Sequence, residues 1–138
     1  MSALEEMIRI AVTAHAGQRD RAGRPYALHP LRLLARMSTD DERMTAVLHD
    51  VLEDTDVGVE ALRAAGCPET VLLALDRLTK REGESYEAFI ERIVDDPLAR
   101  RVKLADLEDN LDLRRLERVT EADLPRINRY LAAHRRLS

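Results

Sequence analysis

Apolar residues recur every three or four positions along most of the chain, and this spacing is the feature that most restricts its fold. Residues at that spacing share one face of an α-helix and can pack together in a core. The pattern runs through Leu4, Ile8, Ala11 and Val12, later through Val71, Leu72, Leu75 and Leu78, and finally through Ile127, Tyr130 and Leu131. No stretch alternates apolar with polar residues as a half-buried strand would. The sequence therefore predicts an all-α fold, a single compact helical bundle.

Capping patterns predict where two of the helices begin. Ser2 with Glu5 and Thr39 with Glu42 have the spacing of a capping box, in which each side chain bonds the backbone N–H of the other residue. The first pattern predicts a helix that ends near Gly17, and the second predicts the start of the third helix.

The remaining boundaries follow from glycine, proline and charged stretches. Residues 17–26 are polar, rich in Arg and interrupted by Gly and Pro, so they should form a loop. Pro30 suits the first position of a second helix because its missing N–H would be unpaired there, and this places His29 at the mouth of that helix. The later expected elements are a short helix over 59–65 closed by Gly66, a helix from Pro68, a loop over 79–85, a helix from Tyr86, a long helix that starts at Asp95 or Asp96 with Pro97 and carries Leu116, and a last helix capped by Thr120 and Asp123.

Length, charge and cysteine content limit the class of protein. A length of 138 residues suits a single domain over 1–138. The net charge of −4 argues against a nucleic-acid-binding surface, and no apolar run approaches the roughly 18 residues that span a bilayer. Cys67 is the single cysteine, so no internal disulfide can form, and there is no apolar leader. We expect a cytoplasmic protein that binds neither nucleic acid nor membrane, and the sequence leaves its oligomeric state open.

A short acidic stretch stands out from the helical pattern. Residues 49–55 read His-Asp-Val-Leu-Glu-Asp-Thr. On one continuous helix, positions four apart share a face, so His49 would lie beside Glu53 and Asp50 beside Asp54. Acidic side chains are seldom buried among apolar residues unless they are paired or bind a metal. The stretch therefore predicts an active site, against the simpler interpretation of a solvated acidic helix face.

Two distant residues can complete a metal site. His29 lies at the start of one predicted helix and Asp106 in the long late helix, and a bundle can bring such side chains together in its core. With His49 and Asp50 they make two imidazoles and two carboxylates, a mixed set that suits Mn²⁺, Fe²⁺ or Zn²⁺. If the ion keeps an open position, its bound water becomes a nucleophile near neutral pH. The acidic pair after the His-Asp doublet is then the candidate to orient that water and move its proton.

These residues belong to a longer ordered set that covers nearly the whole chain. Its members are Ala14-His15-Ala16-Gly17-Gln18, Gly23-Arg24-Pro25-Tyr26, His29-Pro30, Leu48-His49-Asp50, Glu53-Asp54-Thr55, Val102-Lys103-Leu104-Ala105-Asp106 and Asn110. The set resembles the HD-domain phosphohydrolase superfamily, and most of all the small stand-alone alarmone hydrolases of the RelA/SpoT type. A His-Asp doublet alone is a weak signal, whereas the ordered set is a specific one.

The resemblance implies an HD-domain helical bundle and a Mn²⁺-dependent hydrolase that removes pyrophosphate from the 3′ position of the alarmone (p)ppGpp. The substrate would be a small nucleotide, and one metal ion would be the cofactor. The implied metal ligands are His29, His49, Asp50 and Asp106, the implied catalytic acids are Glu53 and Asp54, and the implied substrate contacts are Asn110 and Tyr130.

One loop departs from the family pattern. Relatives carry adjacent basic residues ahead of the Gly-x-Pro-Tyr segment, whereas Arg19-Asp20-Arg21 places an acid between two arginines. Arg21 can still bind phosphate oxygens in bidentate fashion. Asp20 is expected to weaken the positive field that a highly anionic alarmone needs. Two alternatives therefore stay open: a phosphatase that acts on another nucleotide, such as the 2′-phosphate of NADPH, and a nucleotide-binding sensor without catalysis.

Several polar residues have simpler expected roles. The expected surface charges are Glu108, Asp109, Asp112 and the Arg114-Arg115 pair. Lys103 is expected to form a structural ion pair, and His15 to form a hydrogen bond within the core. For Asn110 the alternative to a substrate contact is a hydrogen bond between helices, and for Tyr130 it is packing at a helix interface.

Overall fold

The computed structural model describes residues 1–138 and confirms the all-α prediction. It contains no strand, and its only extended pairing is an isolated bridge between Arg19 and Pro25. The α-helices are α1 Ala3–Ala14, α2 Leu28–Ala35, α3 Asp40–Leu48, α4 Val51–Asp54, α5 Val59–Ala64, α6 Glu69–Leu78, α7 Tyr86–Ile93, α8 Pro97–Asn110 and α9 Leu124–Leu137, with 3₁₀ turns at Leu113–Arg115 and Glu121–Asp123. No helix has both the length and the apolar character needed to cross a bilayer.

The predicted capping boxes form at the starts of α1 and α3. The Ser2 hydroxyl accepts the Glu5 N–H at 3.1 Å, and the Glu5 carboxylate accepts the Ser2 N–H at 2.9 Å. Thr39 likewise accepts the Glu42 N–H at 3.1 Å. The first N–H groups of a helix have no partner within it, so a cap of this kind contributes about 1 kcal/mol. These local contacts set the ends of both helices without help from the rest of the chain.

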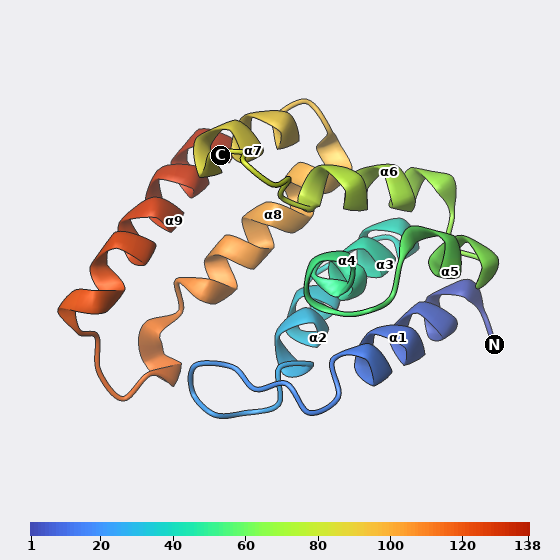
Figure 1. Ribbon diagram of the computed structural model, residues 1–138, viewed down its shortest axis with the longest axis horizontal. Helices are drawn as coiled ribbons and strands as arrows, with labels where there is room; N and C mark the ends of the chain where they lie inside the picture. The colour runs from blue at the N-terminus through green and yellow to red at the C-terminus, as the bar shows by residue number, and fades with distance from the viewer.

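Two groups of buried apolar side chains hold the helices together. One group of 11 residues comes mainly from α1, α3 and α6, and a second group of 14 comes mainly from α6, α7, α8 and α9. α8 runs through the middle of the molecule, with α7 and α9 on one side and α2 and α3 on the other (Figure 1). Leu33 of α2 and Ala46 of α3 belong to the second group, although most of α3 packs in the first. The space where α2, α3 and α8 meet therefore lies between the two cores.

The predicted continuous helix through residues 49–55 is wrong. α3 ends at Leu48, and α4 starts anew at Val51, so His49 and Asp50 form the turn between them. The His49 ring Nδ1 donates to the Ala46 carbonyl at 2.7 Å. In a continuous helix, that carbonyl would accept a backbone N–H instead. Side chains that bond the nearby backbone in this way compete with helix hydrogen bonds. The break aims His49 inward and leaves the following acids on a separate helical turn.

Two other helix boundaries differ from prediction. α2 begins at Leu28 and not at Pro30. Proline is still tolerated, because the N–H groups of the whole first turn have no partner within the helix. α8 ends at Asn110, so Leu116 lies beyond it, after a 3₁₀ turn that the Asp112 side chain caps by accepting the Arg114 N–H.

Candidate active site

The four predicted metal ligands converge where α2, α3 and α8 meet. The Nε2 atom of His29 lies 2.9 Å from Oδ1 of Asp106, although the two residues are 77 positions apart. Nε2 of His49 lies 3.4 Å from the same Asp106 oxygen and 2.9 Å from Oδ2 of Asp50. Ligand atoms of His29, His49 and Asp50 all lie within 4.8 Å of one another. Two imidazoles and two carboxylates thus surround one small space.

Both imidazoles present Nε2 to that space. His49 Nδ1 contacts the Ala46 carbonyl at 2.7 Å, and His29 Nδ1 contacts Oδ2 of Asp109 at 2.6 Å. A carbonyl or carboxylate oxygen only accepts, so each Nδ1 carries a hydrogen, and in the neutral ring Nε2 is then the atom with a lone pair. Nε2 of His49 is buried and forms no hydrogen bond at all. A buried lone pair without a donor, next to carboxylate oxygens, fits a divalent metal ion.

Burial and charge act in opposite directions on the carboxylates of this set. Burial alone would raise the pKa of Asp50, but the neighbouring His49 lowers that pKa to about 2. Burial likewise opposes ionisation of Asp106, but the charges of Lys103 and His49 bring its pKa well below 3.8. For His49, burial lowers the pKa, yet the charges of Asp50 and Asp106 raise it well above 6.5. Both carboxylates are therefore held ionised, as ligands of a cation must be.

Glu53 and Asp54 lie beside the buried set, on the short helix α4. Carboxylate oxygens of Asp50, Glu53 and Asp54 lie within 4.8 Å of one another, and the last two side chains are exposed. Partial removal of water raises the pKa of both Glu53 and Asp54, and the charge of Asp50 adds to the effect. Glu53 also accepts the backbone N–H of Lys80 at 3.0 Å, which fixes its carboxylate at the edge of the site. Carboxylates with raised pKa values beside a buried polar cluster are candidates for a functional site.

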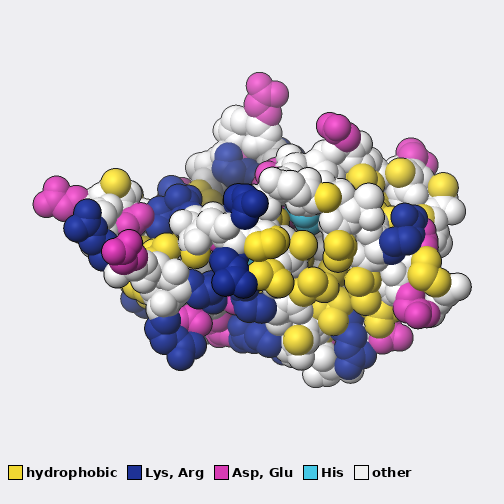
Figure 2. All heavy atoms as spheres, turned by 90° about the horizontal axis from the view of Figure 1, so that it is seen from below, with side chains coloured by type: hydrophobic (Ala, Val, Ile, Leu, Met, Phe, Trp, Pro, Cys, Tyr) yellow, Lys and Arg dark blue, Asp and Glu magenta, His cyan; other side chains and the backbone are white.

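A cavity of about 440 Å³ opens over these residues. The basic side chains that line it are Arg19, Arg21, Arg32, Lys80, Lys103, Arg115, Arg126 and Arg129. On the face shown in Figure 2, most of the Lys and Arg side chains lie on one half, and a histidine is visible near the centre. Six acidic side chains line the same cavity, namely Asp20, Asp50, Glu53, Asp54, Asp106 and Asp112. Eight basic side chains against six acidic ones leave a small excess of positive charge around this cavity in a chain whose net charge is −4, which favours an anionic ligand there.

The three predicted substrate contacts all line this cavity. Arg21 reaches it from the loop between α1 and α2, Asn110 from the end of α8, and Tyr130 from α9. The Asn110 amide also donates to Oδ1 of Asp106 at 3.0 Å, a bond within one helix and not between two. The Tyr130 and Tyr86 rings lie 6.5 Å apart at the interface of α7 and α9.

Two of the simpler predictions are confirmed. Lys103 forms an ion pair with Oδ2 of Asp106 at 2.9 Å, although it also lines the cavity. His15 is buried, and its Nδ1 lies 2.8 Å from the side-chain oxygen of Gln18. In the loop, Asp20 accepts the N–H groups of Ala22 and Arg24, each at 2.9 Å, so the acid that departs from the family pattern also shapes the loop.

Two predicted surface charges are not surface charges. Asp109 is buried and accepts hydrogen bonds from Arg32 at 2.9 Å as well as contacting His29. Arg115 is half-buried and donates to the Asp109 carbonyl at 2.5 Å, so it is not a freely solvated residue. Asp109 lies three positions after Asp106, close to the same helix face, and this spacing was the signal in the sequence. Glu108, between them, points elsewhere and pairs with Arg36 and His134.

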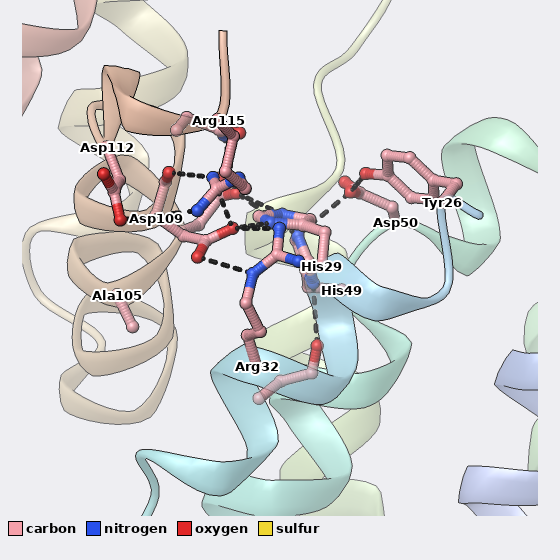
Figure 3. A network of polar contacts seen from close by, with 12 residues as sticks. Tyr26, His29, Arg32, His49, Asp50, Ala105, Asp109, Asp112 and Arg115 are labelled. Carbon is pink, nitrogen blue, oxygen red and sulfur yellow. Dashed lines mark hydrogen bonds and ion pairs between the residues drawn. The ribbon is translucent and has the colours of Figure 1, made fainter. Parts of the chain in front are cut away.

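Tyr26 is a further site residue to which the sequence gave no role. Its hydroxyl donates to Oδ2 of Asp50. The centroid of its ring lies 5.0 Å from that of the His15 ring and 5.7 Å from that of the His29 ring. Figure 3 shows the two histidines side by side, with Asp50 and Tyr26 on one side and Asp109, Arg32 and Arg115 on the other. The only signal was its place in the Gly-Arg-Pro-Tyr segment, three residues before His29.

Comparison with known proteins gives relatives for most of the chain. A guanosine-3′,5′-bis(diphosphate) 3′-pyrophosphohydrolase of Vibrio cholerae is 35% identical over 125 residues, which is 80% of this chain and 18% of that protein. A GTP pyrophosphokinase of Streptomyces coelicolor is 33% identical over 121 residues, 78% of this chain and 14% of that protein. The chain thus spans less than a fifth of the length of these curated relatives. No protein-family model matches it.

A solved structure has the same fold. It is that of a metazoan orthologue of SpoT, described as hydrolysing ppGpp and acting in starvation responses. The two structures match with a TM-score of 0.79 and 25% sequence identity, over 99% of this chain and 84% of the other.

Proposed function

We propose that this chain is a metal-dependent nucleotide phosphohydrolase of the SpoT kind, which removes pyrophosphate from the 3′ position of (p)ppGpp. One observation carries the proposal. His29, His49, Asp50 and Asp106 converge on one space beneath a cavity lined by basic side chains. This arrangement joins a site for a cation to a site for an anion, as metal-assisted phosphate chemistry requires.

The proposed cofactor is one divalent ion, with Mn²⁺ favoured and Fe²⁺ or Zn²⁺ as alternatives. His29 and His49 would hold it through Nε2, and Asp50 and Asp106 through carboxylate oxygens. Mixed nitrogen and oxygen ligands suit these ions better than Ca²⁺, which takes oxygen ligands alone. When bound, such an ion polarises a phosphate oxygen and lowers the pKa of a coordinated water.

Glu53 and Asp54 are the proposed proton-handling residues. They lie beside Asp50 without belonging to the buried set, and their raised pKa values bring them closer to the working pH than ordinary carboxylates. In this proposal, one of them accepts the proton of the attacking water and returns it to the leaving oxygen. The intact pair also argues against a sensor that binds without turnover, because binding alone needs no such acids.

Basic side chains on the cavity wall would hold the substrate phosphates. Arg21 can bind phosphate oxygens in bidentate fashion from the loop, and Arg126 and Arg129 face the cavity from α9. Asn110 and Tyr130 are the proposed contacts to the rest of the nucleotide. The proposed partner is therefore a small nucleotide. One domain over 1–138 and a cytoplasmic location stay predictions.

A turnover assay with Mn²⁺ and a panel of nucleotides tests the proposal. Release of pyrophosphate from ppGpp is the expected result. Orthophosphate released from NADPH, with ppGpp left intact, would replace it with the nucleotide phosphatase. Tight binding of ppGpp without turnover of any nucleotide would identify a sensor.

A further inference from the structure

The Asp109 carboxylate joins one proposed metal ligand to two basic residues of the cavity wall. We infer that Asp109 is a positioning residue: held by Arg32 and Arg115, it fixes the imidazole of His29 so that Nε2 faces the metal position. The inference rests on the proposed metal site, and it gives a role to a residue that was expected from the sequence to be a surface charge.

The contact between His29 and Asp109 is short and shielded from water. Nδ1 of His29 lies 2.6 Å from Oδ2 of Asp109, and the two side chains are only 5% and 8% exposed. Hydrogen bonds to a charged partner are stronger than neutral ones, and a buried one has no water to replace it. The ring of His29 therefore has one strongly preferred orientation, which is set from α8.

Two arginines prevent the Asp109 carboxylate from turning away. Arg32 donates through Nε to Oδ1 and through Nη2 to Oδ2, both at 2.9 Å, which is the two-pronged geometry that suits a carboxylate. Arg115 donates through Nη2 to the Asp109 backbone carbonyl at 2.5 Å and to Oδ2 at 3.3 Å. The acceptor for His29 is thus clamped from α2 and from the turn after α8.

The clamp matters because His29 has a competing hydrogen bond. Its Nε2 lies 2.9 Å from Oδ1 of Asp106, so the other tautomer could donate there and would then have no lone pair for an ion. With Asp109 in place, Nδ1 keeps its hydrogen and Nε2 is left free to bind. Partners of this kind set the ring orientation and basicity of metal-binding histidines in general.

A purely structural role is the simpler reading of the same contacts. Asp109 lies on α8 and both His29 and Arg32 on α2, so the network also ties these helices together. In that case the loss of Asp109 would lower thermal stability and leave metal affinity unchanged. The two roles therefore predict different results for metal binding measured without substrate.

Mn²⁺ affinity, measured by titration calorimetry on the full chain, tests the inference with Asp109→Asn. Asparagine has the same shape, but its single acceptor oxygen cannot receive both prongs of Arg32 and the proton of His29. We expect Mn²⁺ binding to weaken by about 10–100-fold, the usual effect of losing such a partner. Glu108→Gln is the matched control, because it removes one charge from the same helix at a residue that contacts Arg36 and His134, and it should bind within about twofold of wild type.

A double-mutant cycle with Arg32→Gln adds a readout that a structural role would not move. If Arg32 acts on the metal through Asp109, Arg32→Gln weakens Mn²⁺ binding in the wild-type background and has no further effect beside Asp109→Asn. Unchanged Mn²⁺ affinity in Asp109→Asn, together with a lower melting temperature, would overturn the inference. Should Asp109→Asn fail to fold, unchanged affinity in Arg32→Gln alone would overturn it as well.

These outcomes separate the inference from the proposed function. No Mn²⁺ binding by the wild-type chain would overturn both. Weakened binding in Asp109→Asn, with no hydrolysis of ppGpp by the wild type, would support the inference and refute only the proposed substrate.

Discussion

Two pairs of carboxylates lie close together in the site, and their pKa values shift in opposite directions. Asp50 and Asp106 are largely enclosed, yet their pKa values are lowered. Glu53 and Asp54 are exposed, yet their pKa values are raised. Burial alone would predict the reverse order, so the neighbouring charges decide it.

The difference follows from what each pair touches. Asp106 pairs with Lys103 and Asp50 lies against His49, so cations stabilise both ionised forms. For Glu53 and Asp54, partial removal of water raises the pKa, and the nearby charge of Asp50 adds to the effect because it disfavours a second negative charge. The proposed roles divide the two carboxylate pairs in the same way, into ligands of the ion and groups that exchange protons, and opposite pKa shifts of this kind are typical of acid–base catalysis.

Removing a carboxylate of the proposed metal site should have the largest effect. Asp50→Ala is expected to reduce turnover to background. Losing a residue that only contacts a metal ligand weakens metal binding by up to roughly 100-fold. Because Asp50 is a proposed ligand itself, its loss should weaken Mn²⁺ binding by more than that. Metal content by elemental analysis and turnover with Mn²⁺ measure both effects. Asp56→Ala, an exposed acid outside the cavity lining, is the control and should retain both. A metal-loaded, active Asp50→Ala protein would remove the distinction between the pairs.

Removing an exposed acid should affect turnover alone. Glu53→Ala is expected to bind Mn²⁺ normally and to lose about 10²–10⁴-fold in kcat, the usual contribution of a general acid or base. Single-turnover kinetics at saturating Mn²⁺ measure the loss, and Glu60→Ala on α5 serves as the control. Full activity in Glu53→Ala would show that its raised pKa has no catalytic use.

The Tyr26 hydroxyl, which contacts Asp50, should contribute a smaller amount to Mn²⁺ affinity. Tyr26→Phe removes the donor to the Asp50 carboxylate, and losing such a partner of a metal ligand usually costs about 10–100-fold in metal affinity. Tyr130→Phe changes a tyrosine of the same cavity without touching Asp50, and its Mn²⁺ affinity should match wild type. Equal Mn²⁺ affinities in the two variants would contradict the role of Tyr26.

A change of one pH unit should alter Mn²⁺ affinity less than Asp50→Ala or Tyr26→Phe does. In the metal-free protein the charges of Asp50 and Asp106 raise the pKa of His49 well above 6.5, whereas an ion binds only the neutral imidazole. At any pH below that pKa, metal binding must therefore displace a proton from His49. Mn²⁺ affinity should therefore rise by up to about tenfold per pH unit below that pKa and level off above it. Calorimetry in two buffers of different ionisation enthalpy measures the protons released. Binding that releases no proton near pH 7 would show that His49 is already neutral there.

Local signals predicted most of the helices. Apolar spacing and capping residues such as Ser2 and Thr39 act within one or two turns, so they can be read without knowing the rest of the fold. The break after Leu48 was not predicted, because neither Gly nor Pro marks it in the sequence. It accompanies the hydrogen bond from the His49 ring to the Ala46 carbonyl, and no local residue pattern predicts that bond.

The sequence by itself determined an all-helical chain and the identity of the residues able to hold a cation, because helical periodicity and ligand chemistry belong to the residues themselves. Only the tertiary structure decided which acids are buried. Asp109 contacts His29 across 80 positions, while Glu108 beside it faces Arg36 and His134. That choice depends on how α2 approaches α8, and it turns one of two adjacent acids into a partner of the proposed metal ligand.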